Sequence, residues 1–354
     1  MRKVRRFIDC HIPVTTCNLR CSYCYVAQQG LFKQQIPRFE HTAIEIREAL
    51  SVKRMGGACV INLCAGGETL IAPQVIDIVR ELLEEGHYVM VVSNGLLSRR
   101  FEQLAALPLE LRRHLFIKFS FHYLELKRIN AFHTFFANVD KMRSVGISFT
   151  VELMPCDEEI PLIPEIKKVC MDHLGALCHV TIARSDIDPD QKIPHLSKLS
   201  FDEYLKVWGS FDSPLFDFKA SIFYQYRNEF CYAGDWTMFV HLGTGEAMQC
   251  YCGKRLGNIF DSIEFEAIGK GCTQAHCYNG HVWLAFGDIP KLRTPTYAKL
   301  RNRIDAQGRE WLGPVMKDVF SSKLYKRNRR YSIWKKWKIS NIQKGKGMKI
   351  DKGC

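Results

Sequence analysis

Three cysteines near the start of the chain are the residues best suited to chemistry. They stand in the stretch TTCNLRCSYCY, at Cys17, Cys21 and Cys24. Disulfides are disfavoured, because no apolar signal-peptide core follows the charged start MRKVRRFIDC, and no run of about 18 apolar residues suggests a transmembrane segment. We therefore expect a cytoplasmic protein, whose 15 cysteines are more often metal ligands, core residues or reactive thiols in a reducing compartment.

The spacing of these cysteines bears on the kind of metal site. Structural zinc sites usually take four ligands in two pairs. Cys21 and Cys24 form one pair, but no second pair lies nearby, and Cys17 is an extra thiolate. Three thiolates on one loop suit an iron–sulfur cluster better, with one iron left open, because a complete cluster normally takes four cysteines. An open, redox-active iron is a place for chemistry, although zinc or core thiols stay as alternatives.

Polar and glycine-rich turns follow two later apolar runs. The stretch VINLCAGGETL ends its run in Gly66, Gly67 and Glu68, and YVMVVSNGLL ends its run in Ser93 and Asn94. Glycines at the end of a strand allow the backbone to approach a ligand closely. We therefore expect the first of these turns to line a binding site.

Together, these motifs resemble those of the radical S-adenosylmethionine (radical SAM) superfamily. The resemblance implies that Cys17, Cys21 and Cys24 hold a [4Fe–4S] cluster with an open iron site, which binds S-adenosylmethionine. A polar residue at the end of the fourth strand, in SFHYLEL, would also contact this cofactor. The cofactor-binding residues implied in this way are Tyr23, Gly66, Gly67, Glu68, Ser93, Asn94 and Ser120.

The elements that must position these residues alternate between strands and helices. Strand-like segments are expected at 6–13, 58–64, 87–93, 115–121, 147–154 and 177–183, and helical ones at 41–55, 72–85, 99–107, 131–144 and 161–173. Such alternation predicts an α/β fold with parallel βαβ units. The resemblance implies a partial (β/α)6 TIM-like barrel. Functional groups of such barrels gather at the carboxyl ends of the strands, where the motifs fall.

A second group of cysteines follows a polar connector near residue 185. The segment around Cys231 and Cys250, with GNIFD at 257–261, resembles the opening of a SPASM domain in its shortened form, the twitch domain. This resemblance implies one auxiliary [4Fe–4S] cluster, and a structural zinc knuckle is the alternative. The expected ligands are Cys231, Cys250, Cys272 and Cys277, with Cys252 as substitute or bystander.

The charge is concentrated at the end of the chain. Residues 291–354 hold 19 Lys and Arg against 4 Asp and Glu, a net of +15, whereas the whole chain carries +13. We expect three parts: a barrel at 1–190, a SPASM/twitch-like domain at 191–290 and a basic C-terminal tail at 291–354. Apolar residues at 333, 334, 337 and 339 would form one stripe on a helix. The tail would suit an anionic partner, a membrane surface or nucleic acid.

The resemblance implies an enzyme that takes an electron from an external one-electron donor and cleaves S-adenosylmethionine to a radical that abstracts a hydrogen atom. A peptide or protein substrate is expected, although the 16 residues before Cys17 leave no room there for a leader-binding domain. A carbohydrate, glycan or aminocyclitol substrate is the first alternative, and a metal-bearing nucleic-acid-binding protein is a remote one. Cys64 and Cys156, each at a strand end, are candidate hydrogen-atom donors.

Overall fold

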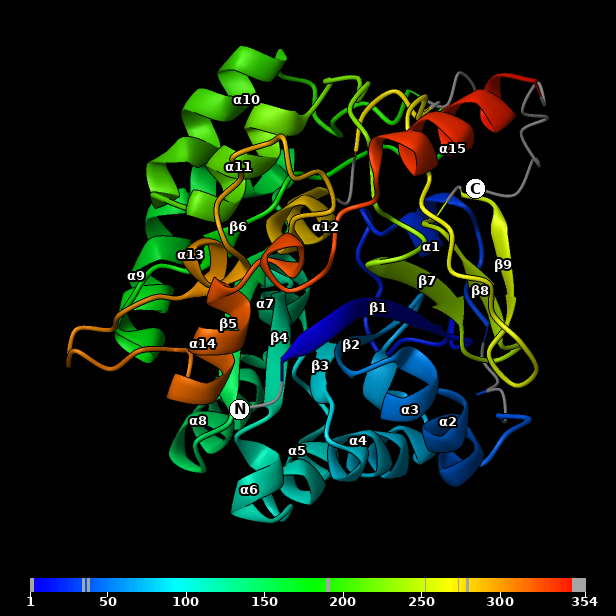
Figure 1. The fold of residues 1–354 in the computed structure, drawn as a ribbon. Helices are drawn as coiled ribbons and strands as arrows, with labels where there is room; N and C mark the ends of the chain where they lie inside the picture. Colours follow the sequence, from blue (N-terminus) through cyan, green and yellow to red (C-terminus); the bar gives the residue numbers. More distant parts are fainter. Residues whose placement is uncertain are drawn as a thin grey trace.

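One sheet of nine strands organises the protein (Figure 1). The computed structural model describes residues 3–33, 36, 39–188, 192–251, 253–272, 274–277 and 280–345. The strand order is β6-β5-β4-β3-β2-β1-β7-β8-β9. The strands are β1 (Val4–Ile12), β2 (Ala58–Ala65), β3 (Tyr88–Ser93), β4 (Leu115–Phe121), β5 (Ser148–Leu153), β6 (His179–Val180), β7 (Thr237–His241), β8 (Glu246–Met248) and β9 (Arg255–Asn258).

The first six strands are parallel and lie in sequence order, which confirms the predicted α/β fold. The seventh strand was not predicted to join them. Phe7 of β1 pairs with Thr237 of β7 in parallel register, and β7, β8 and β9 continue as an antiparallel meander. The sheet therefore continues across the boundary expected at residue 190. The cysteine-rich segment is built onto the edge strand of the barrel.

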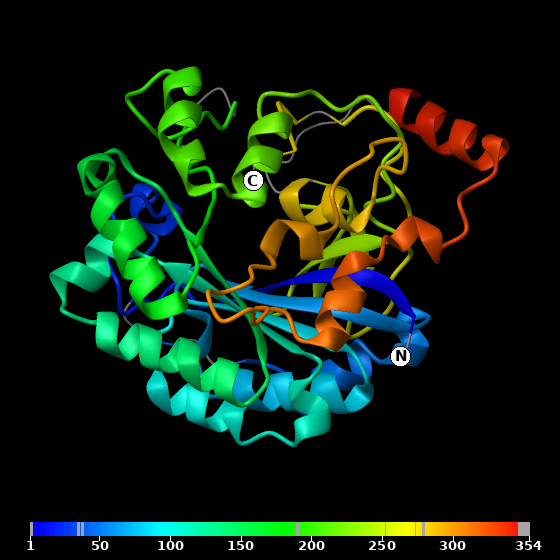
Figure 2. The ribbon, with the colours of Figure 1, turned by 90° about the vertical axis from the view of Figure 1, so that its left-hand side faces the viewer.

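Helices cover both faces of this sheet. In Figure 2, the cyan-to-green helices of the first half lie below the sheet, and the orange helices lie on the opposite side. The helices are α1 (Tyr25–Gln28), α2 (Ala43–Ala49), α3 (Val52–Met55), α4 (Gln74–Glu85), α5 (Ser98–Ala105), α6 (Leu109–Arg112), α7 (Tyr123–Arg128), α8 (Phe132–Ser144), α9 (Ile163–Leu174), α10 (Phe201–Trp208), α11 (Pro214–Ile222), α12 (Gly280–Phe286), α13 (Tyr297–Arg301), α14 (Pro314–Ser321) and α15 (Ile333–Gly345).

Helix ends follow local sequence signals. The predicted capping box at the start of α10 is present, because the Ser200 side chain accepts from the backbone N–H of Glu203 and the Glu203 carboxylate accepts from Ser200. Helix α4 ends at Gly86, whose φ of 97° is one that a glycine adopts easily.

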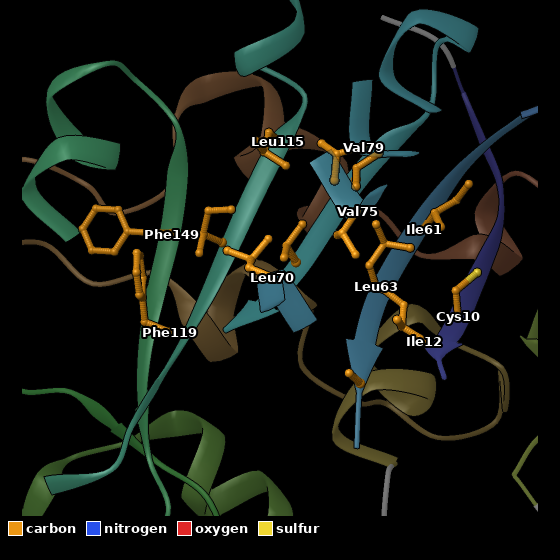
Figure 3. Packing of buried hydrophobic residues seen from close by; sticks show 14 of the residues in the cluster. Cys10, Ile12, Ile61, Leu63, Leu70, Val75, Val79, Leu115, Phe119 and Phe149 are labelled. Carbon is orange, nitrogen blue, oxygen red and sulfur yellow. The ribbon is translucent and has the colours of Figure 1, made fainter. Parts of the chain in front are cut away.

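Side chains alternate between the two faces of the strands, so each face has its own core. On the outer face, Cys10, Ile61 and Leu63 pack with Val75 and Val79 of α4 (Figure 3). On the inner face, a second buried cluster joins strands β1 to β4 to the C-terminal helices. Its members include Phe7, Val60, Met90, Phe116, Phe286, Tyr297, Met316 and Phe320.

This second cluster corrects the expectation of a basic tail from residue 291 onward. Leu300, Leu312 and Phe320 are almost fully buried, and Arg301 is inaccessible to solvent. The excess of Lys and Arg made this stretch look like a solvated extension, but its apolar residues close the inner face of the sheet. Helix α15 lies at the edge of the body (Figure 1).

Helix α15 also differs from the expected apolar stripe. Ile339 is 6% exposed and packs in the inner-face cluster, whereas Ile333, Trp334 and Trp337 are 86%, 79% and 61% exposed. Ile339 thus anchors the helix, and the other three residues point to solvent. Residues 346–354 lie outside the described part of the chain. Among the described residues, no helix is long and apolar enough to span a membrane.

Candidate functional site

The loop with the first three cysteines is fixed to the carboxyl end of the neighbouring strand. It leaves β1 after Ile12, and its backbone carbonyls at Val14 and Thr16 accept from the N–H groups of Gly67 and Glu68, at 2.7 and 2.9 Å. The predicted glycine turn after β2 therefore holds the cysteine loop directly. The two motifs, about fifty residues apart in sequence, form one unit.

Gly67 lies where no side chain fits. A Cβ added there would lie 2.0 Å from the carbonyl oxygen of Thr16, and 2.8 Å from the carbonyl carbon of Thr15. The sequence predicted that this glycine allows close approach of a ligand. In the structure, the backbone of the cysteine loop itself makes the close approach. Gly66 is less restricted, because its nearest neighbours would be Tyr25 and Val14 at 3.3 and 3.4 Å.

Glu68 joins the ends of β2 and β3 through its carboxylate. One oxygen accepts from the Ser93 hydroxyl at 2.8 Å and from the Leu70 N–H at 3.0 Å, and the other accepts from the Asn94 N–H at 2.7 Å. Burial raises the pKa of Glu68, and these hydrogen bonds act in the opposite direction. Both oxygens of Glu68 thus have partners within the protein, so its clearest role is to position the turn after β3.

Asn94 connects that turn to the cysteine loop. Its side-chain amide donates to Asn18 at 2.6 Å and lies 3.7 Å from the sulfur of Cys17. A hydrogen bond from the backbone N–H of Leu19, at 3.4 Å, reaches the same sulfur. Donors aimed at a sulfur favour its thiolate form, so Asn94 and Leu19 suit a metal-binding Cys17.

The three thiols share one small apolar cluster. Cys21 and Tyr23 are buried with Leu19 and Cys156, and the half-buried Cys17 and Cys24 pack against them. The pKa of Cys17 is raised to about 11 and that of Cys21 to about 12, mainly by burial and to a smaller extent by the neighbouring thiols. The thiols are thus near one another in surroundings where they need a positive group to become thiolates.

Three thiols on one loop match the protein ligands of a [4Fe–4S] cluster that has one open iron site. In the described part of the chain, no three Cys, His, Asp or Glu residues are placed to hold one metal ion. A [4Fe–4S] cluster binds each thiolate through a different iron, so its ligands stand farther apart than those of one ion. The residues present therefore fit a cluster with three protein ligands.

Tyr23 and Ser120 lie beside this loop. The Tyr23 hydroxyl and Nδ1 of His122 are 2.8 Å apart, and burial lowers the pKa of His122 to about 4, so a neutral imidazole holds the tyrosine. Ser120 is half-buried near the end of β4 and pairs in register with Glu152. Contact of Tyr23 and Ser120 with a cofactor stays a prediction.

The two candidate hydrogen-atom donors, Cys64 and Cys156, lie in different places. Cys156 lies in the cluster of the three thiols, and its N–H donates to Glu159, a buried acid whose pKa burial raises to about 8. Cys64 is half-buried on the inner face of β2, and burial raises its thiol pKa to about 12. A protonated thiol can give a hydrogen atom, and both residues keep this predicted role.

The second group of cysteines is also brought together. The thiols of Cys231, Cys250 and Cys277 are close enough to act on one another electrostatically, and Cys272 acts on Cys277. Burial raises the pKa of Cys231, Cys272 and Cys277. The four predicted ligands thus form one group, which fits an auxiliary cluster. Cys252 lies outside the described residues.

Sequence reasoning missed a layer of polar side chains on the inner face of the sheet. Asp9 accepts from Asn62 at 2.8 Å and from the Tyr251 hydroxyl. Glu152 pairs with Lys118 at 3.3 Å and with Arg301 of α13 at 2.8 Å. The sequence contained a signal for these strand residues, because each of them interrupts an apolar run. Residues on a strand alternate between its two faces, and these lie on the face that carries Phe7, Val60 and Phe116.

Comparison with known proteins gives a family match for part of the chain and a similar fold. Residues 11–159 match the family described as the Radical SAM superfamily. In sequence, the chain matches none of the curated proteins with which it was compared. In fold, it is similar to the crystal structure of Streptococcus suis SuiB bound to S-adenosylmethionine, with 15% identity, a TM-score of 0.50, and coverage of 73% of this chain and 64% of SuiB.

The structure of the same Streptococcus suis protein bound to the precursor peptide SuiA gives a similar result. The identity is 15%, the TM-score is 0.50, and the coverage is 74% of this chain and 64% of SuiB. The chain thus spans about two thirds of SuiB, and at this identity the likeness concerns the fold. The family match includes the cysteine loop, the glycine turn after β2 and the turn after β3. The match to the Radical SAM superfamily thus covers residues 11–159, the part of the chain that carries all three motifs.

Proposed function

We propose that this protein is a radical SAM enzyme that abstracts a hydrogen atom from a peptide or protein substrate, with an auxiliary [4Fe–4S] cluster in its second cysteine group. The observation that carries the proposal is the cysteine loop held on the glycine turn of β2, within the matched family region. A [4Fe–4S] cluster with S-adenosylmethionine, when bound, supplies a 5′-deoxyadenosyl radical after one-electron reduction by an external donor.

The chain's own residues would position these groups and keep water away from them. Cys17, Cys21 and Cys24 would hold the first cluster, and Asn94 would direct its amide toward Cys17. Glu68 fixes the turn that carries Asn94. The apolar cluster around Leu19 would limit access of solvent.

A peptide substrate has support from the fold alone. SuiB is described in complex with a precursor peptide, and this chain shares its fold over about three quarters of its own length.

The exposed Trp334 and Trp337 of α15, beside Lys335 and Lys338, would suit an anionic partner or membrane surface. Binding of such a partner or membrane through α15 would be separate from hydrogen-atom abstraction.

The iron content of anaerobically reconstituted protein tests the proposal. We expect about eight irons per chain, four for each cluster. Replacing Cys17, Cys21 and Cys24 together by Ala should leave about half, and so should replacing Cys231, Cys250, Cys272 and Cys277. As a matched control, Cys170→Ala removes a buried thiol of α9 and should keep all eight. Protein that takes up zinc in place of iron would contradict the proposal.

A further inference from the structure

Two basic residues from the second half of the chain are buried against the inner face of the barrel. Lys219 of α11 is 5% exposed, and its ammonium donates to the Thr181 hydroxyl and to the Ile182 carbonyl at 3.4 Å. His281 of α12 is 6% exposed. Helix α11 packs beside β6, and the adjacent helix α12 lies over β1, where Phe286 stacks on Phe7 (Figure 1).

Positive charge is in excess around this pair. The charged groups with the strongest effect on Lys219 are Arg184, Lys118, Glu152 and Arg301, of which three are cations. Arg184 itself pairs with Asp186 at 3.0 Å. The four charges with the strongest effect on His281 are all positive. Glu152 is already paired with both Lys118 and Arg301. Burying cations without matching anions is costly, so a missing negative charge would stabilise this group.

Hydrogen-bond donors are also in excess here. Arg301 is inaccessible to solvent, yet only its Nε has an acceptor, and its two terminal nitrogens have none among the described residues. The Nδ1 of His281 is likewise buried without a partner in that part of the chain. Buried polar atoms are nearly always paired in proteins. Several unpaired nitrogens beside buried cations indicate a binding site for a chemical group that only accepts hydrogen bonds.

Residues next to this group or acting on it also approach both cysteine segments. Arg184 acts electrostatically on Tyr25, the residue after Cys24. A Cβ on Gly280, which precedes His281, would lie 3.1 Å from the sulfur of Cys277. The group is thus linked to the segment after Cys24 and to the segment that holds Cys277.

We propose that Lys219 and His281, supported by Arg301, form an anion-binding subsite, and that the substrate carries a carboxylate or phosphate group which docks there. This inference rests on the proposed function, because it assigns the subsite to the substrate of that reaction. Arginine and lysine are the usual partners of such oxygens. The proposal narrows the substrate class to acidic molecules.

Calorimetric titration of the reconstituted protein tests the subsite with small probes. Glutarate represents a carboxylate, inorganic phosphate represents a phosphate, and glutaramide is the neutral match of glutarate. We expect glutarate or phosphate to bind to the wild type and glutaramide not to bind. The tighter anion identifies the substrate's acidic group. Lys219→Met should weaken this binding at least tenfold, and Lys219→Arg should restore most of it.

The exposed Lys168 of α9 supplies a matched control, because Lys168→Met removes a surface cation and should leave the affinity unchanged. His281→Gln gives a second test, with binding expected to weaken severalfold. The melting temperature and iron content of each variant show that it is folded. Equal affinity of wild type and folded Lys219→Met, or no anion binding to the wild type, would overturn the subsite. Binding needs no turnover, so failure of S-adenosylmethionine cleavage would contradict the proposed function alone.

Discussion

A single methyl group added at Gly67 should cost the protein its first iron–sulfur cluster. In Gly67→Ala the new Cβ would lie 2.0 Å from the Thr16 carbonyl oxygen and 2.6 Å from its carbonyl carbon. Backbone atoms cannot rotate away as a side chain does, so the cysteine loop must move. That movement breaks the hydrogen bonds from Gly67 to Val14 and from Glu68 to Thr16. We expect Gly67→Ala to retain about four irons, those of the auxiliary site.

The adjacent glycine provides a matched control. In Gly66→Ala the nearest atom would be the Tyr25 hydroxyl at 3.3 Å, at the end of a side chain that can shift slightly. We expect this variant to hold the full iron content and to lose little stability. Iron analysis and the melting temperature of both variants decide the point. A normal iron content in Gly67→Ala would show that the loop does not depend on this close contact.

Truncation at two positions should separate the body from its last helix. Deleting residues 321–354 removes Lys323, whose ammonium donates to Ala285 and Pro295 at 2.6 Å, and Leu324, which is 3% exposed. It also removes Asn328, which donates to the Arg5 carbonyl at 2.9 Å. Loss of one large buried side chain alone costs about 2–5 kcal/mol, a large share of a total stability of about 5–15 kcal/mol. We expect this truncation to prevent stable folding.

Deleting only residues 332–354 should have a much smaller effect on the fold. It removes α15, in which Ile339 is the one described apolar residue that is buried, while Trp334 and Trp337 face solvent. We expect soluble protein with a melting temperature lowered by a few degrees, since 1 kcal/mol shifts it by about 2–4 °C in a chain of this size. Thermal unfolding monitored by circular dichroism compares the two truncations. Similar melting curves for the longer deletion and the wild type would contradict the burial of residues 321–331.

The strands and the cysteine loop could be predicted because their signals are local. The apolar runs of β2 to β5 are bounded by polar or glycine turns, and the three cysteines are seven residues apart at most. The pairing of β7 with β1 joins residues more than 200 positions apart, and no periodicity in either strand indicates its partner. Parallel pairing at such separation depends on the whole fold.

The charge composition of the C-terminal segment led to a wrong prediction of a basic tail, because burial of its basic residues also depends on the whole fold. Arg301 counts as one more basic residue in the sequence, yet it is buried against Glu152 of β5. Lys323 is also buried, with carbonyl oxygens as acceptors. A net charge does not distinguish solvated cations from those paired inside the protein. The inner-face residues Asp9, Asn62 and Lys118 could have been found from their alternation with apolar neighbours.

The formation of 5′-deoxyadenosine tests the account most directly. Reconstituted protein given S-adenosylmethionine and a strong one-electron reductant should release 5′-deoxyadenosine and methionine, even without its substrate. The variant with Cys17, Cys21 and Cys24 replaced by Ala should release none, while the Cys170→Ala control should match the wild type. Absence of 5′-deoxyadenosine from wild-type protein that holds its full iron content, or equal formation by the triple variant, would contradict the account.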